Sequence, residues 1–178
     1  MSAVGPRLVR DGSRELRFNG AVLGSVTSQR PAAPRWSEIV VYRVTDGTYL
    51  ISKVGRSTIA HRPSCTRVNR RRMVALREAR DEARVWRTPC VECRPEVGRV
   101  EDMDPDTILE TTRYSALLGE NADAAVRLLT NDREGGELPR LIRDVLRQAS
   151  EADPELAKYA AAVIAGPNGL AENTTRTP

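Results

Sequence analysis

The residues of this chain that are best suited to metal chemistry lie in one short stretch. The sequence contains one histidine and three cysteines, which are spaced as His61-x3-Cys65 and Cys90-x2-Cys93. A Cys-x2-Cys pair places two thiolates on one tight turn, and a structural zinc site takes four nitrogen or sulfur ligands in a tetrahedron. We therefore expect these four residues to bind Zn²⁺. The alternative is a chance grouping of buried or free cysteines and a surface histidine, but chance would scatter the four along the chain.

The same four residues limit the enzymatic chemistry that the chain can perform. If the only histidine binds metal, no Ser-His or Cys-His nucleophile can be built, and four good ligands leave zinc no open position for a substrate. The sequence has no P-loop and no dinucleotide-binding fingerprint. The acidic residues Asp102, Asp104 and Asp106 are better explained as compensation of a helix dipole than as a Mg²⁺ site. We therefore expect a protein that is not an enzyme.

Charge is unevenly distributed along the 178 residues, although the net charge is only +4. Residues 56–99 carry 12 arginines and 5 acidic residues, a net charge of +7, whereas residues 100–178 carry 8 basic and 15 acidic residues, a net charge of −7. The basic segment could bind nucleic acid, whereas the acidic segment would repel it. Equally, the two segments could attract each other within one fold.

A dense group of arginines marks where nucleic acid would bind. We expect these side chains to contact the phosphates of duplex DNA, because aromatic residues make up only 4% of the chain and offer few platforms for base stacking. Alternatively, these arginines pair with nearby acidic residues or with the acidic helices. A further possibility is that the acidic helices bind a protein partner. The arginines are Arg67, Arg70, Arg71, Arg72, Arg77, Arg80 and Arg84.

Turn and cap signals predict the elements that surround these residues. Asn19-Gly20 and Asp46-Gly47 each lie between apolar runs, which is typical of a β-hairpin. The expected strands are residues 15–18, 21–26, 38–45 and 48–54, and residues 1–14 are expected to be flexible. Apolar residues at helical spacing and N-cap residues predict helices over residues 71–86, 105–118, 121–129, 138–149 and 154–165.

The stretch that carries the metal ligands resembles the Ada-type zinc-binding module, which opens a bacterial alkylation-response methyltransferase. The likeness covers about residues 46–95 and rests on Arg62-Pro63-Ser64-Cys65, a following helix, and then Pro89, Cys90, Cys93 and Pro95. It implies a zinc site at His61, Cys65, Cys90 and Cys93, with an association with DNA as a weaker implication. In the family the first ligand is a cysteine that accepts a methyl group from DNA phosphotriesters. Because His61 stands there, that repair reaction should be absent.

Together these patterns predict an α+β protein: an antiparallel β meander with a zinc-clamped helix, followed by a small all-helical C-terminal region. The expected divisions are an N-terminal hairpin and linker over residues 1–37, an Ada-like module over 38–98, an acidic helical region over 99–167, and a disordered tail over 168–178. We expect a non-enzymatic zinc-binding protein with a basic surface, acting as a DNA-associated accessory or regulatory factor. The alternative is a protein-interaction factor that uses its acidic helices and in which zinc is purely structural.

The sequence also predicts where the protein resides. It has no apolar run near the roughly 18 residues that a membrane span needs, and its N-terminus lacks the apolar core of a secretory signal. Three cysteines cannot pair completely, which favours a reducing compartment over a disulfide framework. We therefore expect a cytoplasmic protein that does not bind membranes.

Overall fold

The structure, a computed structural model, describes residues 3–31, 33–68, 73–75, 88–93, 106–130 and 138–165. It is an α+β fold, as the sequence predicted. Contacts divide the chain into two units. The first is formed by Met1–Ser28, Glu38–Val54 and Tyr114–Pro178, and the second by Gln29–Ser37 and Gly55–Arg113.

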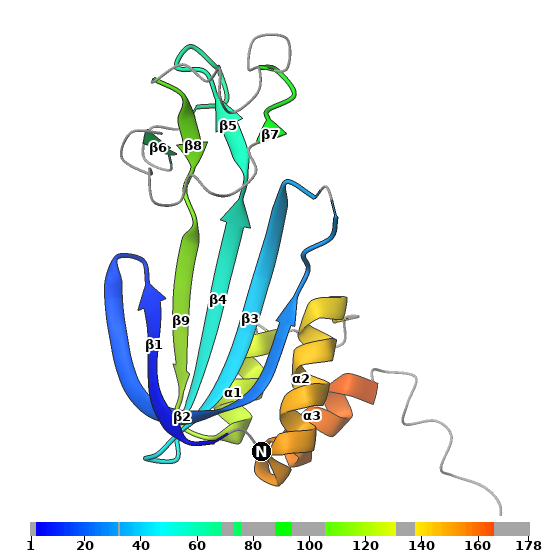
Figure 1. The fold of residues 1–178 in the computed structure, drawn as a ribbon. Helices are drawn as coiled ribbons and strands as arrows, with labels where there is room; N and C mark the ends of the chain where they lie inside the picture. The colour runs from blue at the N-terminus through cyan, green and yellow to red at the C-terminus, as the bar shows by residue number, and fades with distance from the viewer. Residues whose placement is uncertain are drawn as a thin grey trace, which may run out of the picture. The chain divides into compact units, whose positions relative to one another are not determined.

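A curled antiparallel sheet of five strands, in the order β1-β2-β3-β4-β9, dominates the first unit (Figure 1). Strand β2 is long and passes alongside both β1 and β3. Its register to β3 shifts between Val22 and Gly24, an irregularity that bends a strand and increases its twist. The strands are β1 (Gly5–Asp11), β2 (Arg14–Thr27), β3 (Arg35–Val44), β4 (Tyr49–Ser57) and β9 (Arg113–Gly119).

In the described part of the chain, three helices cover one face of this sheet (Figure 1). They are α1 (Ala122–Thr130), α2 (Arg140–Ala152) and α3 (Pro154–Ala165). The core between the layers contains apolar side chains from both, among them Val41 and Ile51 of the sheet and Val145, Leu146 and Leu156 of the helices. The cysteines are not part of this hydrophobic core.

The second unit contains a small sheet with the strand order β6-β8-β5-β7. Its strands are β5 (Ile59–His61), β6 (Met73–Ala75), β7 (Thr88–Pro89) and β8 (Ile108–Glu110). Strand β5 pairs in parallel with β7 and antiparallel with β8. Among the described residues of this unit, Ile59, Cys65, Cys90 and Cys93 form a buried cluster, with Val68 packed against it.

Two features of the N-terminal prediction are wrong. Residues Gly5–Asp11 form strand β1 within the segment expected to be flexible. The first hairpin turns at Gly12, whose φ is +58°, and Asn19-Gly20 lies inside β2. The second hairpin is confirmed, because Gly47 has a φ of +91° and its N–H donates to the Val44 carbonyl at 3.0 Å.

The helix predictions are confirmed only near the C-terminus. Asn121 and Asp153 cap α1 and α3 through side-chain oxygens that accept N–H bonds at 2.9 Å from Ala124 and Glu155. The region after residue 99 is not all-helical, since β8 and β9 replace most of the helix expected over residues 105–118.

Other predictions fall partly or wholly beyond the described residues. Met73–Ala75 form a strand, so the helix expected over residues 71–86 does not include them; its remaining positions lie outside the described residues, as does the tail over 168–178. Within the described ranges, no helix has both the length and the apolarity to cross a bilayer.

Candidate metal centre

Strand pairing in the second unit brings the two halves of the ligand set together. His61 is the last residue of β5 and pairs with Ile108 of β8. Cys90 directly follows β7, and its N–H donates to the Ala60 carbonyl at 3.0 Å. The parallel pairing of β5 with β7 therefore places Cys90 beside His61, although 28 residues separate them in the sequence.

Tight turns supply the other two thiols. The Cys65 N–H donates to the Arg62 carbonyl at 3.0 Å, and the Cys93 N–H donates to the Cys90 carbonyl at the same distance. The second turn is the Cys-x2-Cys knuckle expected from the spacing. In each half of the site, the end of a strand positions one ligand, His61 or Cys90. The turn that follows brings the next ligand, Cys65 or Cys93, close to it.

The four side chains form one compact, buried cluster. Their candidate ligand atoms all lie within 4.8 Å of one another. The Sγ atoms of Cys65 and Cys90 are 3.7 Å apart, and those of Cys90 and Cys93 are 3.3 Å apart. Ligands about 2.3 Å from a tetrahedral zinc would be separated by about 3.8 Å. The donor atoms are therefore spaced nearly as a single tetrahedral ion requires, and the three cysteines form no disulfide.

The ring of His61 has one satisfied and one unsatisfied nitrogen. Its Nε2 lies 3.3 Å from Glu110 Oε1, while its Nδ1 is buried without a hydrogen-bond partner. A buried polar atom without a partner costs roughly 1–3 kcal/mol. A metal ion bound by Nδ1 would remove that cost, so the residues present fit a metal.

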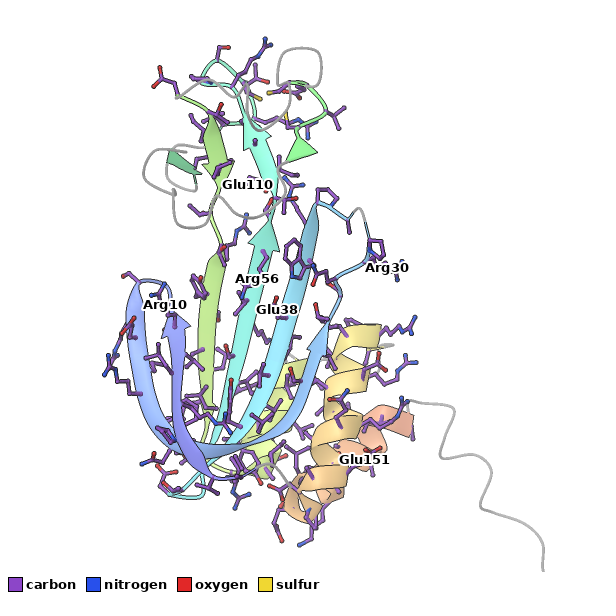
Figure 2. The ribbon with its side chains drawn as sticks, in the orientation of Figure 1. Arg10, Arg30, Glu38, Arg56, Glu110 and Glu151 are labelled. Carbon is purple, nitrogen blue, oxygen red and sulfur yellow. The ribbon has the colours of Figure 1, made fainter. Side chains whose placement is uncertain are left out.

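Glu110 is held by four contacts, and it is labelled on β8 in Figure 2. Arg35 donates from Nε to Oε2 at 2.8 Å and from its terminal nitrogen to Oε1, and Ser57 Oγ donates to Oε2 at 2.7 Å. Burial acts to raise the pKa of this carboxyl, but the hydrogen bonds from Arg35, Ser57 and His61 outweigh it and lower the pKa to about 2. Glu110 is therefore a fixed anion behind the histidine.

The pKa values of the Cys65 and Cys90 thiols are shifted in opposite directions. Burial raises the pKa of the Cys65 thiol to about 11. Burial also acts against ionisation of Cys90, but hydrogen bonding with Cys93 and Cys65 overcomes it and lowers the pKa of the Cys90 thiol. Three thiolates this close together repel one another, so a cation among them favours the ionised form that binds metal.

A contact outside the ligand set joins the two loops. Glu92, within the Cys-x2-Cys knuckle, accepts hydrogen bonds from Thr66 Oγ1 at 2.9 Å and from Arg67 Nε. Its Oε2 also lies 3.7 Å from Cys65 Sγ. The loop after β5 is thereby tied to the loop after β7 across the cluster.

The structure brings together the predicted metal ligands but describes only one of the arginines predicted to contact DNA. It brings His61, Cys65, Cys90 and Cys93 together, all buried. Arg67 is exposed and forms an ion pair with Glu92. The other arginines expected to contact DNA lie outside the described residues. Sequence reasoning missed Glu110 and Arg35, because no local pattern links residues so far apart.

Comparison with known proteins adds no further assignment: no family model, no curated protein and no solved structure matches this chain. The function must therefore be argued from the residues and their geometry.

Proposed function

We propose that His61, Cys65, Cys90 and Cys93 bind one Zn²⁺ ion in a closed, structural site. The observation that carries this proposal is the burial of four ligand atoms within 4.8 Å, with His61 Nδ1 lacking a partner. Three thiolates and an imidazole in a tetrahedron are a donor set that suits zinc. All four coordination positions are filled by protein, so the ion has no position free for a substrate.

The position of the cysteines within the described buried cluster supports a structural role. In the described part of the second unit, this cluster contains Ile59 and the three cysteines, with one partly buried valine against them. The thiols thus make up most of this cluster, and a metal ion bound among them would join the loop after β5 to the loop after β7. Zinc binding would stabilise this unit, because a site that exists only in the folded state couples binding to folding.

Cobalt substitution tests the geometry of this site. Co²⁺ accepts the same ligands and reports tetrahedral thiolate coordination through intense visible d–d bands and a thiolate-to-metal charge-transfer band. We expect one equivalent of Co²⁺ to produce both bands and one equivalent of Zn²⁺ to abolish them. A weak octahedral spectrum would contradict the proposed ligand set.

At the level of the whole chain, we propose a non-enzymatic, DNA-associated accessory or regulatory factor built on an Ada-like zinc module. The support is the net charge of +7 over residues 56–99, which surrounds the ligands. Arginine forks bind phosphate oxygens in a bidentate manner. Since His61 replaces the family's methyl-accepting cysteine, binding rather than repair is the role proposed.

Duplex binding at several salt concentrations tests this role. Each phosphate contact contributes about −0.9 to the slope of log K against log salt. Reversing three charges together, by Arg70→Glu, Arg71→Glu and Arg72→Glu, should weaken binding and make the slope shallower by about 2.7. The matched control is Arg140→Glu on α2, whose side chain is 86% exposed. Binding that is insensitive to the triple substitution would contradict the DNA proposal.

The alternative is a protein-interaction factor in which zinc is purely structural. The net charge of −7 over residues 100–178 favours it, because such a surface attracts a basic partner rather than DNA. A zinc-loaded protein that shows no salt-dependent DNA binding would favour this alternative over the first proposal.

A further inference from the structure

We infer that Glu110 is a positioning residue for the metal centre, which fixes the ring of His61 so that Nδ1 rather than Nε2 binds the ion. This inference rests on the proposed zinc site. Glu110 lies outside the stretch that resembles the Ada-type module, and nothing in the ligand pattern points to it.

The tautomer of His61 follows from its partner. Arg35 donates to both oxygens of Glu110, so both act as acceptors and the histidine nitrogen facing Glu110 is the donor. That nitrogen is Nε2, at 3.3 Å from Oε1. With the proton on Nε2, the nitrogen left to bind a metal is Nδ1, the buried atom without a partner. Glu110 therefore selects the ligand atom without touching the ion.

The carboxylate is itself rigidly placed. Arg35 grips both oxygens and Ser57 donates to Oε2 at 2.7 Å, while His61 reaches Oε1. The side chain of Glu110 is only 15% exposed and that of His61 only 2%. Outer partners of this kind orient metal-binding histidines, and their loss commonly costs about 10–100-fold in metal affinity.

This arrangement also links the metal to a distant segment. Arg35 comes from Gln29–Ser37, which precedes the ligands by more than twenty residues yet belongs to the same unit. Ser57 ends β4, and Glu110 ends β8. One carboxylate thus joins three segments to the ligand histidine, and losing Arg35 should lower metal affinity through Glu110.

A comparison in two backgrounds separates positioning from general support of the fold. In the chain with His61, Glu110→Ala should lower the Zn²⁺ affinity, measured by competition with a chromogenic chelator, by about 10–100-fold. In a His61→Cys background the ring is gone, so Glu110→Ala should not lower the affinity. The matched control is Glu15→Ala, which removes a carboxylate that pairs with Arg10 in the first unit.

A spectroscopic measurement reports the tautomer directly. Long-range ¹⁵N–¹H correlation of zinc-loaded protein should show a protonated Nε2 and a metal-bound Nδ1 at His61. If Glu110→Ala does not fold, Glu110→Gln keeps the size of the side chain but removes its charge. It should lower the zinc affinity in the His61 background only.

The outcomes distinguish the two proposals. If the wild-type protein binds no zinc, the proposed site fails. If it binds zinc but the Glu110 variants bind equally well, or lose affinity equally in both backgrounds, the positioning role is overturned. A zinc ion bound to Nε2 would overturn it as well.

Discussion

At the scale of single residues, the candidate metal centre depends on the contact between His61 and Glu110. His61, Cys65, Cys90 and Cys93 are rare residue types at short spacings, so their grouping could be predicted without knowing the fold. Glu110 lies 49 residues from His61. One of 24 acidic residues, it carries no local signal, and only the pairing of β5 with β8 brings it to the histidine. A residue such as Glu110, which long-range strand pairing brings to the site, could therefore not be predicted from the sequence.

A second set of polar contacts in the first unit leads to a prediction on alkaline pH. Tyr49 is 1% exposed, and its hydroxyl donates to Asp153 Oδ2 at 2.9 Å. Burial and the bond to Asp153 raise the pKa of this phenol to about 12. Its stabilising contribution is present below the ordinary phenol pKa of about 10 and is lost as pH rises to about 12. The free energy of unfolding should fall over that range.

Replacing the phenol tests this account. Tyr49→Phe should lower the free energy of unfolding at neutral pH by about 1–2 kcal/mol, and should make its fall between about pH 10 and 12 shallower. Denaturant unfolding at a series of pH values measures both effects. The control is Tyr159→Phe on α3, where the side chain is exposed. An equally steep alkaline loss in wild type and Tyr49→Phe would contradict the role given to Tyr49.

Among the elements, those defined by local chemistry were predicted correctly. The Asp46-Gly47 turn forms because Gly47 accepts a positive φ, and Asp46 Oδ1 accepts the Thr48 N–H at 2.8 Å. The caps at Asn121 and Asp153 likewise involve only the next few residues. Such signals act within one turn of chain, so a single sequence contains them completely.

The wrong predictions arose where tertiary contacts override local patterns. A Cβ at Gly20 would lie 2.6 Å from the Arg43 carbonyl oxygen, so this glycine permits close approach of β3 rather than a turn. A helix was predicted over residues 105–118, but residues 107–112 are rich in threonine and other strand formers, and β8 pairs with β5 and β6. Pairing partners so distant in the sequence cannot be read from local periodicity.

The contact of α2 with β2 predicts a sensitive glycine. A Cβ at Gly24 would lie 2.9 Å from the Val145 carbonyl oxygen and 3.0 Å from the Ala149 nitrogen, both backbone atoms of α2. Gly24→Ala should therefore force the helix outward and lower the free energy of unfolding by about 1–3 kcal/mol. Thermal or denaturant unfolding measures this change. Gly5→Ala is the matched control, because nothing lies within 4 Å of a Cβ there, and equal stabilities of the two variants would contradict the packing described.

For the whole molecule, the two units differ in what stabilises them. Among the described residues, the buried cluster of the first unit consists of sheet and helix side chains, whereas that of the second consists largely of the cysteines. A strong chelator should therefore abolish the ordered structure of the second unit and leave the first folded. Amide hydrogen exchange should show protection lost in β5 and β8 and retained in α2 and the adjoining β2.

Refilling the site provides the control for this chelation experiment. Adding Zn²⁺ should restore protection in β5 and β8, whereas Mg²⁺ should not, because it prefers oxygen ligands. Retention of full protection in both units after complete metal removal would show that the cysteines pack well enough on their own, and the structural role of zinc would then be wrong.

The most direct test of the zinc centre is the metal content of the purified protein, measured by plasma mass spectrometry beside Cys90→Ser. Both proteins should be prepared without chelator, and their folding verified by circular dichroism. We expect about one zinc per wild-type chain and a large loss in the variant, because Cys90 Sγ lies within 3.7 Å of both other thiols. A folded wild-type protein that contains no metal would contradict the account.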